Sequence, residues 1–474
     1  MSADPTPQNP PRPEYEPPDT QRPASMSPTE GQLEGESPVG ARRLEGGREE
    51  KHDPYAALRL PDYRAYCLGW VISVVGRQIQ DVAIGYEIYE RTGSKLALGW
   101  IGLAQAIPLM LFALPAGHFA DRFDRRRIVM ITQAVWVLSS AGLAAVSHLH
   151  GPVWAMYVLL GAGSAAHAAG WPARASLMPQ IVPPDVFNNA VTWNSSFFQI
   201  ASVVGPAVGG ALLLLGAPAA YLVDAGCGAT FLALIGLVRL RPIARSTESH
   251  PLRSFAAGVR FVWRNKILLA TMTLDLFAVL LGGSIYLLPV FAKDILKVEA
   301  VGFGVLKTAP AVGAFVAAMF IAHLPPMKRA GWSMLWAVAG FGAATVVFAV
   351  SKSFWLSFAM LALTGAFDNV SVVVRHTLVQ ALPPDSMRGR VAAVNAMFIG
   401  ASNELGGLES GLTAAWWGPV ASVLVGGVGT IVVVALVAII WPQVRRFGSL
   451  KDARPLEEDP PGAFEVLPVP AKTA

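Results

Sequence analysis

The chain has 474 residues, of which 53% are hydrophobic and only 15% are charged. Because soluble globular chains carry about 25% charged residues, this composition argues against a water-soluble body and for one embedded in a lipid bilayer. The net charge of +5 needs no nucleic-acid partner, since the basic residues gather in loops between apolar segments. The two cysteines, Cys67 and Cys227, lie in apolar segments and form neither a disulfide framework nor a metal-binding pattern. We expect no metal and no cofactor.

Residues 1–54 are rich in Pro, Ser, Glu and Gln and contain no long apolar run. Such a segment cannot bury enough apolar surface to order itself, and it lacks the apolar centre of a signal peptide. We expect a disordered cytoplasmic tail over 1–54 and a second one over 443–474.

Between the tails lie twelve mainly apolar stretches of about 20 residues or more, the length with which an α-helix crosses a bilayer. The predicted spans are 66–89, 96–119, 128–148, 153–176, 188–215, 218–239, 267–292, 302–324, 332–350, 354–380, 388–414 and 418–441. The longest polar connection divides them into six and six. The sequence therefore predicts an all-α membrane protein with twelve transmembrane helices, built as six-helix bundles over 55–240 and 267–442 and joined by a cytoplasmic linker over 241–266.

Heavily and lightly basic loops alternate along the chain. The loops after the even-numbered spans carry Arg122, Arg125, Arg126, Arg127, Arg239, Arg241, Arg245, Arg253, Arg260, Arg264, Lys266, Lys328, Arg329, Arg388, Arg390, Arg445 and Arg446. The intervening loops carry few basic residues. Because cytoplasmic loops are enriched in Lys and Arg, we expect both termini in the cytoplasm.

A repeat relates the two predicted bundles. Residues 174–185 read RASLMPQIVPPD, and residues 375–385 read RHTLVQALPPD, which aligns with one gap. The alignment begins at Arg174 and Arg375 and extends into the fifth span of each bundle, where it matches Gly205 with Gly406. Paired six-helix repeats place the substrate near the bilayer midplane, between the bundles.

The loop after the second span contains a glycine, an Asp-Arg pair and a basic run. These residues are Gly117, Asp121, Arg122, Arg125 and Arg126. The pattern resembles the signature loop of the major facilitator superfamily of transporters. At the end of a span, a carboxylate can face a helix N-terminus or pair with an arginine such as Arg174. We expect this loop, with Arg174 and Arg375, to form a gate that closes the cytoplasmic side. The alternative is a solvated basic loop that only sets topology.

The fifth span carries a run of small residues, namely Gly205, Pro206, Gly209 and Gly210. This run is similar to the Gly-Pro-x-x-Gly-Gly signature of exporters and antiporters in the same superfamily. The stretch over 55–446 resembles the enterobactin-exporter and macrolide-efflux branch, which implies export of small molecules driven by the proton gradient. Small residues also serve ordinary helix packing, so that interpretation stays open. The matching stretch of the second bundle keeps glycines but lacks the proline.

Ionisable groups inside a span cost at least about 2.5–3.5 kcal/mol each on insertion scales, so each is a functional candidate. In the first span, Arg77, Gln80 and Asp81 share one helical face, which is expected to point toward the cavity. Asp81 is the first candidate for the carboxylate that takes up the coupled proton. The alternative is that Arg77 and Asp81 neutralise each other in a purely structural pair.

Other ionisable residues of the spans are weaker candidates. Glu404 is second to Asp81 for proton coupling, and it could instead bind a cationic substrate. Asp275 and Asp368 follow, and Asp368 shares a helical face with Arg375. A lone His167 among small residues is expected to be packed rather than functional.

The leading prediction is a proton-coupled exporter of small molecules, with its substrate, protons and the lipid bilayer as partners, acting as a monomer in the inner membrane. An importer or an uncoupled facilitator of the same fold is an alternative, as is a non-transporting membrane sensor. A membrane enzyme is not supported, because no set of nucleophile, base and orienting group occurs in any loop.

Overall fold

The computed structural model describes residues 53–240, 251–325 and 327–450, apart from the side chains of 113, 114, 118, 120, 121 and 251–254. Most of the two predicted tails and the first part of the predicted linker therefore lie outside the described residues. The described residues belong to one unit that begins at Asp53.

The first half of the chain forms six long helices at the predicted spans. They are α1 (Pro61–Thr92), α2 (Lys95–Arg122), α3 (Arg125–His148), α4 (Val153–Ala175), α6 (Phe187–Leu212) and α7 (Ala217–Leu237). Shorter turns are η1 (Ala57–Arg59), α5 (Met178–Ile181), η2 (Pro184–Val186) and η3 (Leu213–Leu215). We call α1 to α7 the N-half. Pro61 at the start of α1 and Gly93 after its end, in the left-handed conformation, match the residue preferences of helix ends.

The second half repeats this pattern with one interruption. Its long helices are α9 (Lys266–Leu281), α11 (Ala300–His323), α12 (Ala330–Val350), α13 (Phe354–Ala381), α14 (Asp385–Trp417) and α15 (Pro419–Ile440). Shorter helices are α8 (Pro251–Arg264), which lies in the predicted linker, η4 (Gly283–Ile285), α10 (Leu288–Val290), the π-helical turn Phe291–Ile295 and α16 (Pro442–Arg446). We call α9 to α16 the C-half.

The seventh predicted span is broken rather than continuous. A single helix was expected over 267–292, but α9 ends before Gly282, and η4, α10 and a π-helical turn follow it. Gly282 and Gly283 weaken the helix, and Pro289 removes a backbone donor, so the helix is interrupted where neighbouring helices can accept the freed groups.

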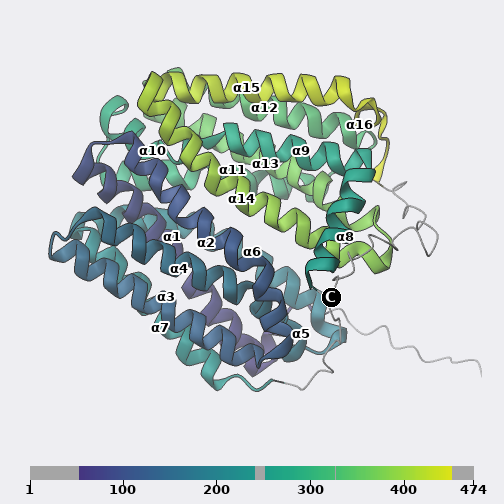
Figure 1. Cartoon of the computed structure of the whole chain (residues 1–474), viewed down its shortest axis with the longest axis horizontal. Coiled ribbons are helices and arrows are strands. Elements are labelled where there is room, and N and C mark those ends of the chain that lie inside the picture. Colours follow the sequence, from purple (N-terminus) through teal and green to yellow (C-terminus); the bar gives the residue numbers. More distant parts are fainter. Residues whose placement is uncertain (1–52, 241–250, 326, 451–474) are drawn as a thin grey trace, which may run out of the picture. The chain divides into compact units, whose positions relative to one another are not determined.

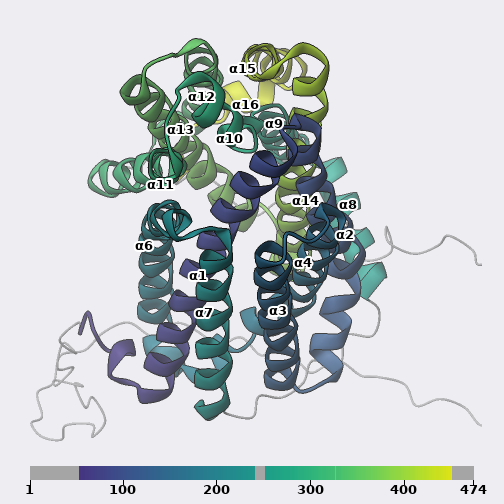
Figure 2. The same ribbon diagram turned by 90° about the vertical axis from the view of Figure 1, so that its left-hand side faces the viewer.

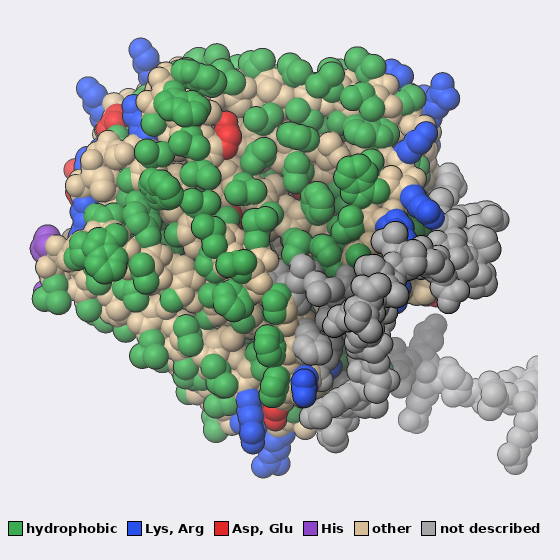
Figure 3. All heavy atoms as spheres, viewed as in Figure 1, with side chains coloured by type: hydrophobic (Ala, Val, Ile, Leu, Met, Phe, Trp, Pro, Cys, Tyr) green, Lys and Arg blue, Asp and Glu red, His purple; other side chains and the backbone are tan. Residues whose placement is uncertain are grey.

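Nine helical segments in the described part of the chain are long and apolar enough to cross a membrane. The three other predicted spans coincide with the long helices α1, α4 and α14, whose polar or charged side chains lower their hydropathy. Large apolar side chains are exposed on the outside of the bundles, including Leu138, Trp336 and Ile439. Figure 3 shows hydrophobic side chains spread over the viewed face, with Lys and Arg near its margins. Lipid tails are the surroundings that such a surface fits.

The two halves pack through two equivalent interfaces. Within each half, the first span packs on the fifth, through α1 with α6 and through α9 with α14. Between the halves, α2 packs on α14, and α6 packs on α11. Each of these interfaces joins the second span of one half to the fifth span of the other. The repeat seen in the sequence thus corresponds to an equivalent pairing of spans in the structure. Figures 1 and 2 show the helices of the N-half and those of the C-half as two groups.

Candidate functional site

Ionisable side chains from both halves line one small cavity. Arg77 and Asp81 reach it from α1, His167 from α4 and Glu404 from α14. The cavity has a volume of about 80 Å³. Drug-sized ligands usually need a pocket of about 300–1,000 Å³, so this chamber is too small for such a molecule in the present conformation. We call it the central chamber.

Arg77 contacts a histidine rather than the nearby carboxylate. Its guanidinium lies 2.5 Å from Nε2 of His167, whose ring also packs edge-on against Trp136 and Trp171. Among the described contacts, no ion pair joins Arg77 to Asp81. The self-neutralising pair is therefore absent from this arrangement. His167, expected to be a packing residue, lines the chamber and contacts its arginine.

Lys307 is a half-buried cation that the sequence analysis did not single out. It lies on α11, inside the eighth predicted span, and its Nζ donates to the backbone carbonyl of Asp81 at 2.6 Å. The contact joins the C-half to the N-half at the helix turn that carries the first proton-coupling candidate. An ionisable side chain inside a span is costly, whether it is Asp81 or Lys307. The sequence alone could therefore have identified Lys307 as a functional candidate.

Glu404 is fixed where the halves cross. The hydroxyl of Tyr286 donates to its Oε2 at 3.1 Å. A side chain at Gly102 on α2 would collide with the backbone oxygen of Glu404, so the two helices approach closely here. Asp81, Lys307 and Glu404 thus come from three helices of two halves to the same boundary.

Gln80 points elsewhere. Its Oε1 lies 2.9 Å from the Ser140 hydroxyl, which lies 2.6 Å from Oδ2 of Asp224. Trp136 also donates its indole N–H to Asp224, which is fully buried. This network joins α1, α3 and α7 inside the N-half, so the structure does not bring Gln80 to the central chamber.

In the C-half, the other candidates gather around a separate cavity. Asp275 on α9 forms a buried ion pair with Arg375 on α13. Asp275 and Asp368 line a cavity of about 130 Å³. Arg375 is thus neutralised deep inside the C-half.

We expect Asp275→Asn to destabilise the protein, because it leaves the buried Arg375 guanidinium without a counter-charge. Removing one partner of a buried ion pair costs about 3–5 kcal/mol. The thermal unfolding midpoint of the purified protein should fall, and the apolar double variant Asp275→Leu/Arg375→Met should recover most of the loss. Asp185→Asn, at an exposed loop position, is the control. An unchanged midpoint in Asp275→Asn would mean that the pair does not stabilise the fold.

The basic loop after α2 is anchored to its own half. Arg126 donates to the carbonyl of Gly236 at the end of α7, and Asp124 accepts from the first backbone N–H groups of α3. Arg122 is exposed, and no described atom lies within 4 Å of a Cβ placed at Gly117. The side chain of Asp121 lies outside the described residues. A gate contact from this loop to the C-half therefore stays a prediction, including the expected parts of Arg125, Arg174 and Arg375.

The small-residue run of α6 packs against two different helices. A Cβ at Gly205 would meet Gln78 of α1, and one at Gly209 would meet Val82 of the same helix. Pro206 is buried beside them. Gly210 instead faces α11 of the C-half, where a Cβ would lie only 2.7 Å from the Cα of Gly304. The run thus packs α6 within its own half and, through one glycine, against the other half.

Two matched glycine contacts close the halves at one end. Gly210 of α6 meets Gly304 of α11, and Gly411 of α14 meets Gly99 of α2. The two contacts use equivalent positions of the repeat. Gly99 and Gly304 are each the fifth residue of their helix. Gly210 and Gly411 each lie five residues after the repeat-matched glycines Gly205 and Gly406. The hydroxyl of Tyr89 also donates to Asp294 of the C-half at 2.5 Å. We call this the closed end; it is the end at which α1 finishes and α2 begins.

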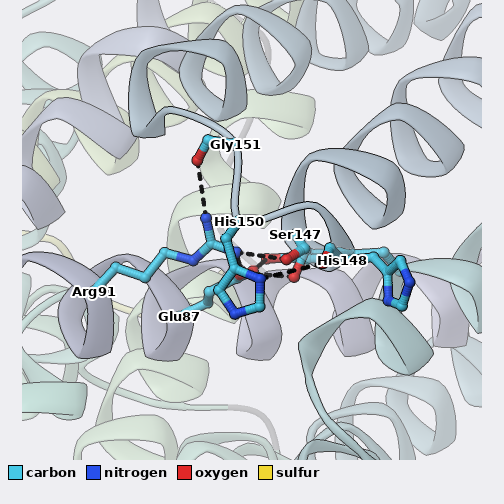
Figure 4. A network of polar contacts seen from close by, with 7 residues as sticks. Glu87, Arg91, Ser147, His148, His150 and Gly151 are labelled. Atoms are coloured by element: carbon cyan, nitrogen blue, oxygen red, sulfur yellow. Dashed lines mark hydrogen bonds and ion pairs between the residues drawn. The ribbon is translucent and has the colours of Figure 1, made fainter.

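A polar network holds the N-half together at the closed end. Glu87 pairs with Arg91 one turn later on α1, at 2.6 Å, and accepts from the hydroxyls of Ser147 and Tyr221. Arg91 donates to the carbonyls of Ser147 and Gly151. Figure 4 shows Glu87 and Arg91 turned toward the loop between α3 and α4. Three helices of the N-half are therefore tied together here.

Two pseudo-symmetric six-span halves with an ionisable chamber between them define a transporter of the major facilitator fold. Solved structures share that fold. One is a bacterial homolog of the human lysosomal transporter Spinster, with a TM-score of 0.64, 15% identity, and coverage of 85% of this chain and 99% of that one. Another is a D-xylose–proton symporter, with a TM-score of 0.63, 13% identity, and coverage of 83% and 100%.

The family described as transmembrane secretion effectors matches residues 52–464, and the chain belongs to this family of major facilitator transporters. Its function is thus transport across a membrane rather than enzymatic catalysis. Among its relatives is the enterobactin exporter EntS of Citrobacter koseri, which is 28% identical over 396 residues, covering 82% of this chain and 93% of the relative. EntS of Escherichia coli O1:K1 / APEC is equally similar, with the same coverage.

Proposed function

We propose that the protein exports small drug- or siderophore-like molecules across the inner membrane in exchange for protons. The observation that carries the proposal is the meeting of Asp81 and Glu404, one from each half, at one chamber, with Lys307 bonded to the backbone carbonyl of Asp81. Ionisable groups within a bilayer are costly and mark the routes of protons and substrates. Membership of a secretion family, and similarity to enterobactin exporters, support outward movement.

In this proposal both termini lie in the cytoplasm, so the closed end faces the periplasm. The basic loops after the even-numbered spans support that orientation. The halves then alternate by rocking about the chamber, and the cytoplasmic end opens to receive the substrate. The hydrogen bond from Lys307 to the Asp81 carbonyl crosses the halves, so it breaks when the periplasmic end opens.

The charges at the boundary supply a means of coupling. An ionised Asp81 attracts the Lys307 ammonium and favours the state in which the periplasmic end is closed. Protonation of Asp81 removes that attraction and deprotonation restores it, so the charge state of Asp81 shifts the balance between the two end states. Glu404, held by Tyr286 on the C-half side, is the second carboxylate at the same boundary.

Purified protein in proteoliposomes tests the proposal directly. A trapped pH-sensitive dye reports proton movement while enterobactin, a macrolide and a cationic dye are offered in turn. We expect at least one compound to be moved against its own gradient and to trigger proton movement in the opposite direction. Compound movement without proton movement would favour an uncoupled facilitator. Folded protein that moves none of the compounds would contradict export of these classes.

A further inference from the structure

We infer that the N-half holds a binding site for the anionic group, a carboxylate or similar oxyanion, of the transported molecule. The inference rests on the proposed function for its substrate, and it names that substrate's chemical class. A pocket beside the central chamber is lined by Arg77 of α1 and by His167 and Arg174 of α4. Two guanidinium groups and an imidazole thus converge on one pocket.

The two arginines have no carboxylate partner among the described residues. The ion pairs between described residues involve other arginines and Lys293, not Arg77 or Arg174. The Nε of Arg174 is buried and makes no hydrogen bond. Among the described carboxylates inside the N-half, Asp224 accepts hydrogen bonds from Trp136 and Ser140, and Glu87 pairs with Arg91. Asp81 lines the neighbouring chamber with Arg77 but, within the described contacts, forms no ion pair with either arginine. Because a buried guanidinium without a counter-charge is costly, this pocket favours an anion from outside.

The internal repeat provides a comparison for this pocket. Arg375 is the repeat-matched counterpart of Arg174, and in the C-half it is neutralised by Asp275 of the first span. In the N-half, the first-span residues that line the pocket are Trp70, Ser73, Val74 and Arg77, none of which is acidic. One copy of the repeat therefore carries its own counter-charge, and the other leaves the arginine facing a pocket. Arg174 lies in the last turn of α4, where the helix dipole favours a positive charge. The dipole of α4 does not explain why Arg77 of α1 lines the same pocket.

The size of the pocket limits what enters it. Its volume is about 30 Å³, which suits a carboxylate-sized group rather than a whole molecule. Arg77, Trp136 and His167 line both this pocket and the central chamber. An anionic group seated here would thus leave the rest of its molecule directed to the chamber, and planar guanidinium groups suit a carboxylate through paired hydrogen bonds. The indole rings of Trp70 and Trp136 favour an aromatic acid.

Binding of radiolabelled benzoate to the purified full chain tests the inference, with unlabelled benzoate, benzamide and benzylammonium as competitors at constant ionic strength. We expect saturable binding that benzoate displaces at least tenfold better than benzamide, and no displacement by benzylammonium. Arg174→Gln should weaken benzoate binding about tenfold to a hundredfold, the range for one hydrogen bond to a charged group. Arg174→Lys should keep part of the affinity, and Arg445→Gln, an exposed arginine elsewhere, should keep all of it.

Because Arg174 also lies over the Phe231 ring at 5.8 Å, each variant is checked for a monodisperse elution profile, and Arg77→Gln provides a second test from another helix. Absence of saturable benzoate binding, equal competition by benzamide, or unchanged affinity in folded variants of both arginines would overturn the site. Benzoate binding that depends on the arginines, in protein that transports no compound, would support the site and count only against export. Proton-coupled transport without benzoate binding would support the proposed export and contradict the anion site.

Discussion

Replacing Asp81 by asparagine should abolish substrate-triggered proton movement while the protein still inserts and folds. Asparagine keeps the size of the side chain but cannot take up a proton at neutral pH. The Lys307 contact to the Asp81 backbone carbonyl does not use the side chain, so the helices remain joined. Arg77 contacts His167 and not Asp81, so no ion pair is broken. The expected effect is therefore loss of coupling rather than loss of the fold.

The proteoliposome assay with a trapped pH-sensitive dye measures this effect, and the elution profile and thermal midpoint monitor the fold. Asp185→Asn makes the same chemical change at an exposed position and should leave the proton signal unchanged. Glu404→Gln is examined in parallel because Glu404 lines the same chamber. A full proton signal in Asp81→Asn together with its loss in Glu404→Gln would move the coupling role to Glu404.

The fold could be predicted from sequence because membrane insertion is recorded locally. Each span needs a run of apolar residues long enough for the bilayer, and each cytoplasmic loop carries its basic excess in adjacent residues. The internal repeat also predicted two related six-helix bundles, because Arg174 and Arg375 align together with the residues that follow them. The break after α9 was less visible. Gly282, Gly283 and Pro289 can be read in the sequence, but membrane helices often tolerate such residues.

The site was predicted less completely, because its contacts join residues far apart in the chain. Helical spacing made Asp81 a possible neighbour of Arg77, but side-chain packing from α4 gave the arginine His167 instead. Lys307 contacts a backbone carbonyl, a partner that no residue pattern marks. Gln80 shares a helical face with Arg77, and the proximity of α3 still draws it to Ser140. Sequence identified which spans hold charges, and tertiary packing decides which charges meet.

Placing a side chain at Gly210 should prevent the closed end from forming. An alanine Cβ would lie 2.7 Å from the Cα of Gly304 and 2.8 Å from the carbonyl oxygen of Ala300. These are backbone atoms, which cannot swing aside as a flexible side chain can, so the two helices must separate. Gly210→Ala should therefore shift the protein toward conformations with that end apart, and Gly210→Val should do so more strongly. By the equivalence of the two glycine contacts, Gly411→Ala should act in the same way at Gly99.

Spin labels at Leu215 and Trp355, both exposed at the closed end, report the separation of the halves when Cys67 and Cys227 are replaced. We expect a longer distance distribution in Gly210→Ala and a large loss of transport, because alternation needs both end states. Gly226→Ala is the matched control, since nothing lies within 4 Å of a Cβ at that helical glycine. A distribution identical to that of the unsubstituted protein would show that the glycine contact is not needed for closure. A shift without loss of transport would mean that closure at this end does not limit the cycle.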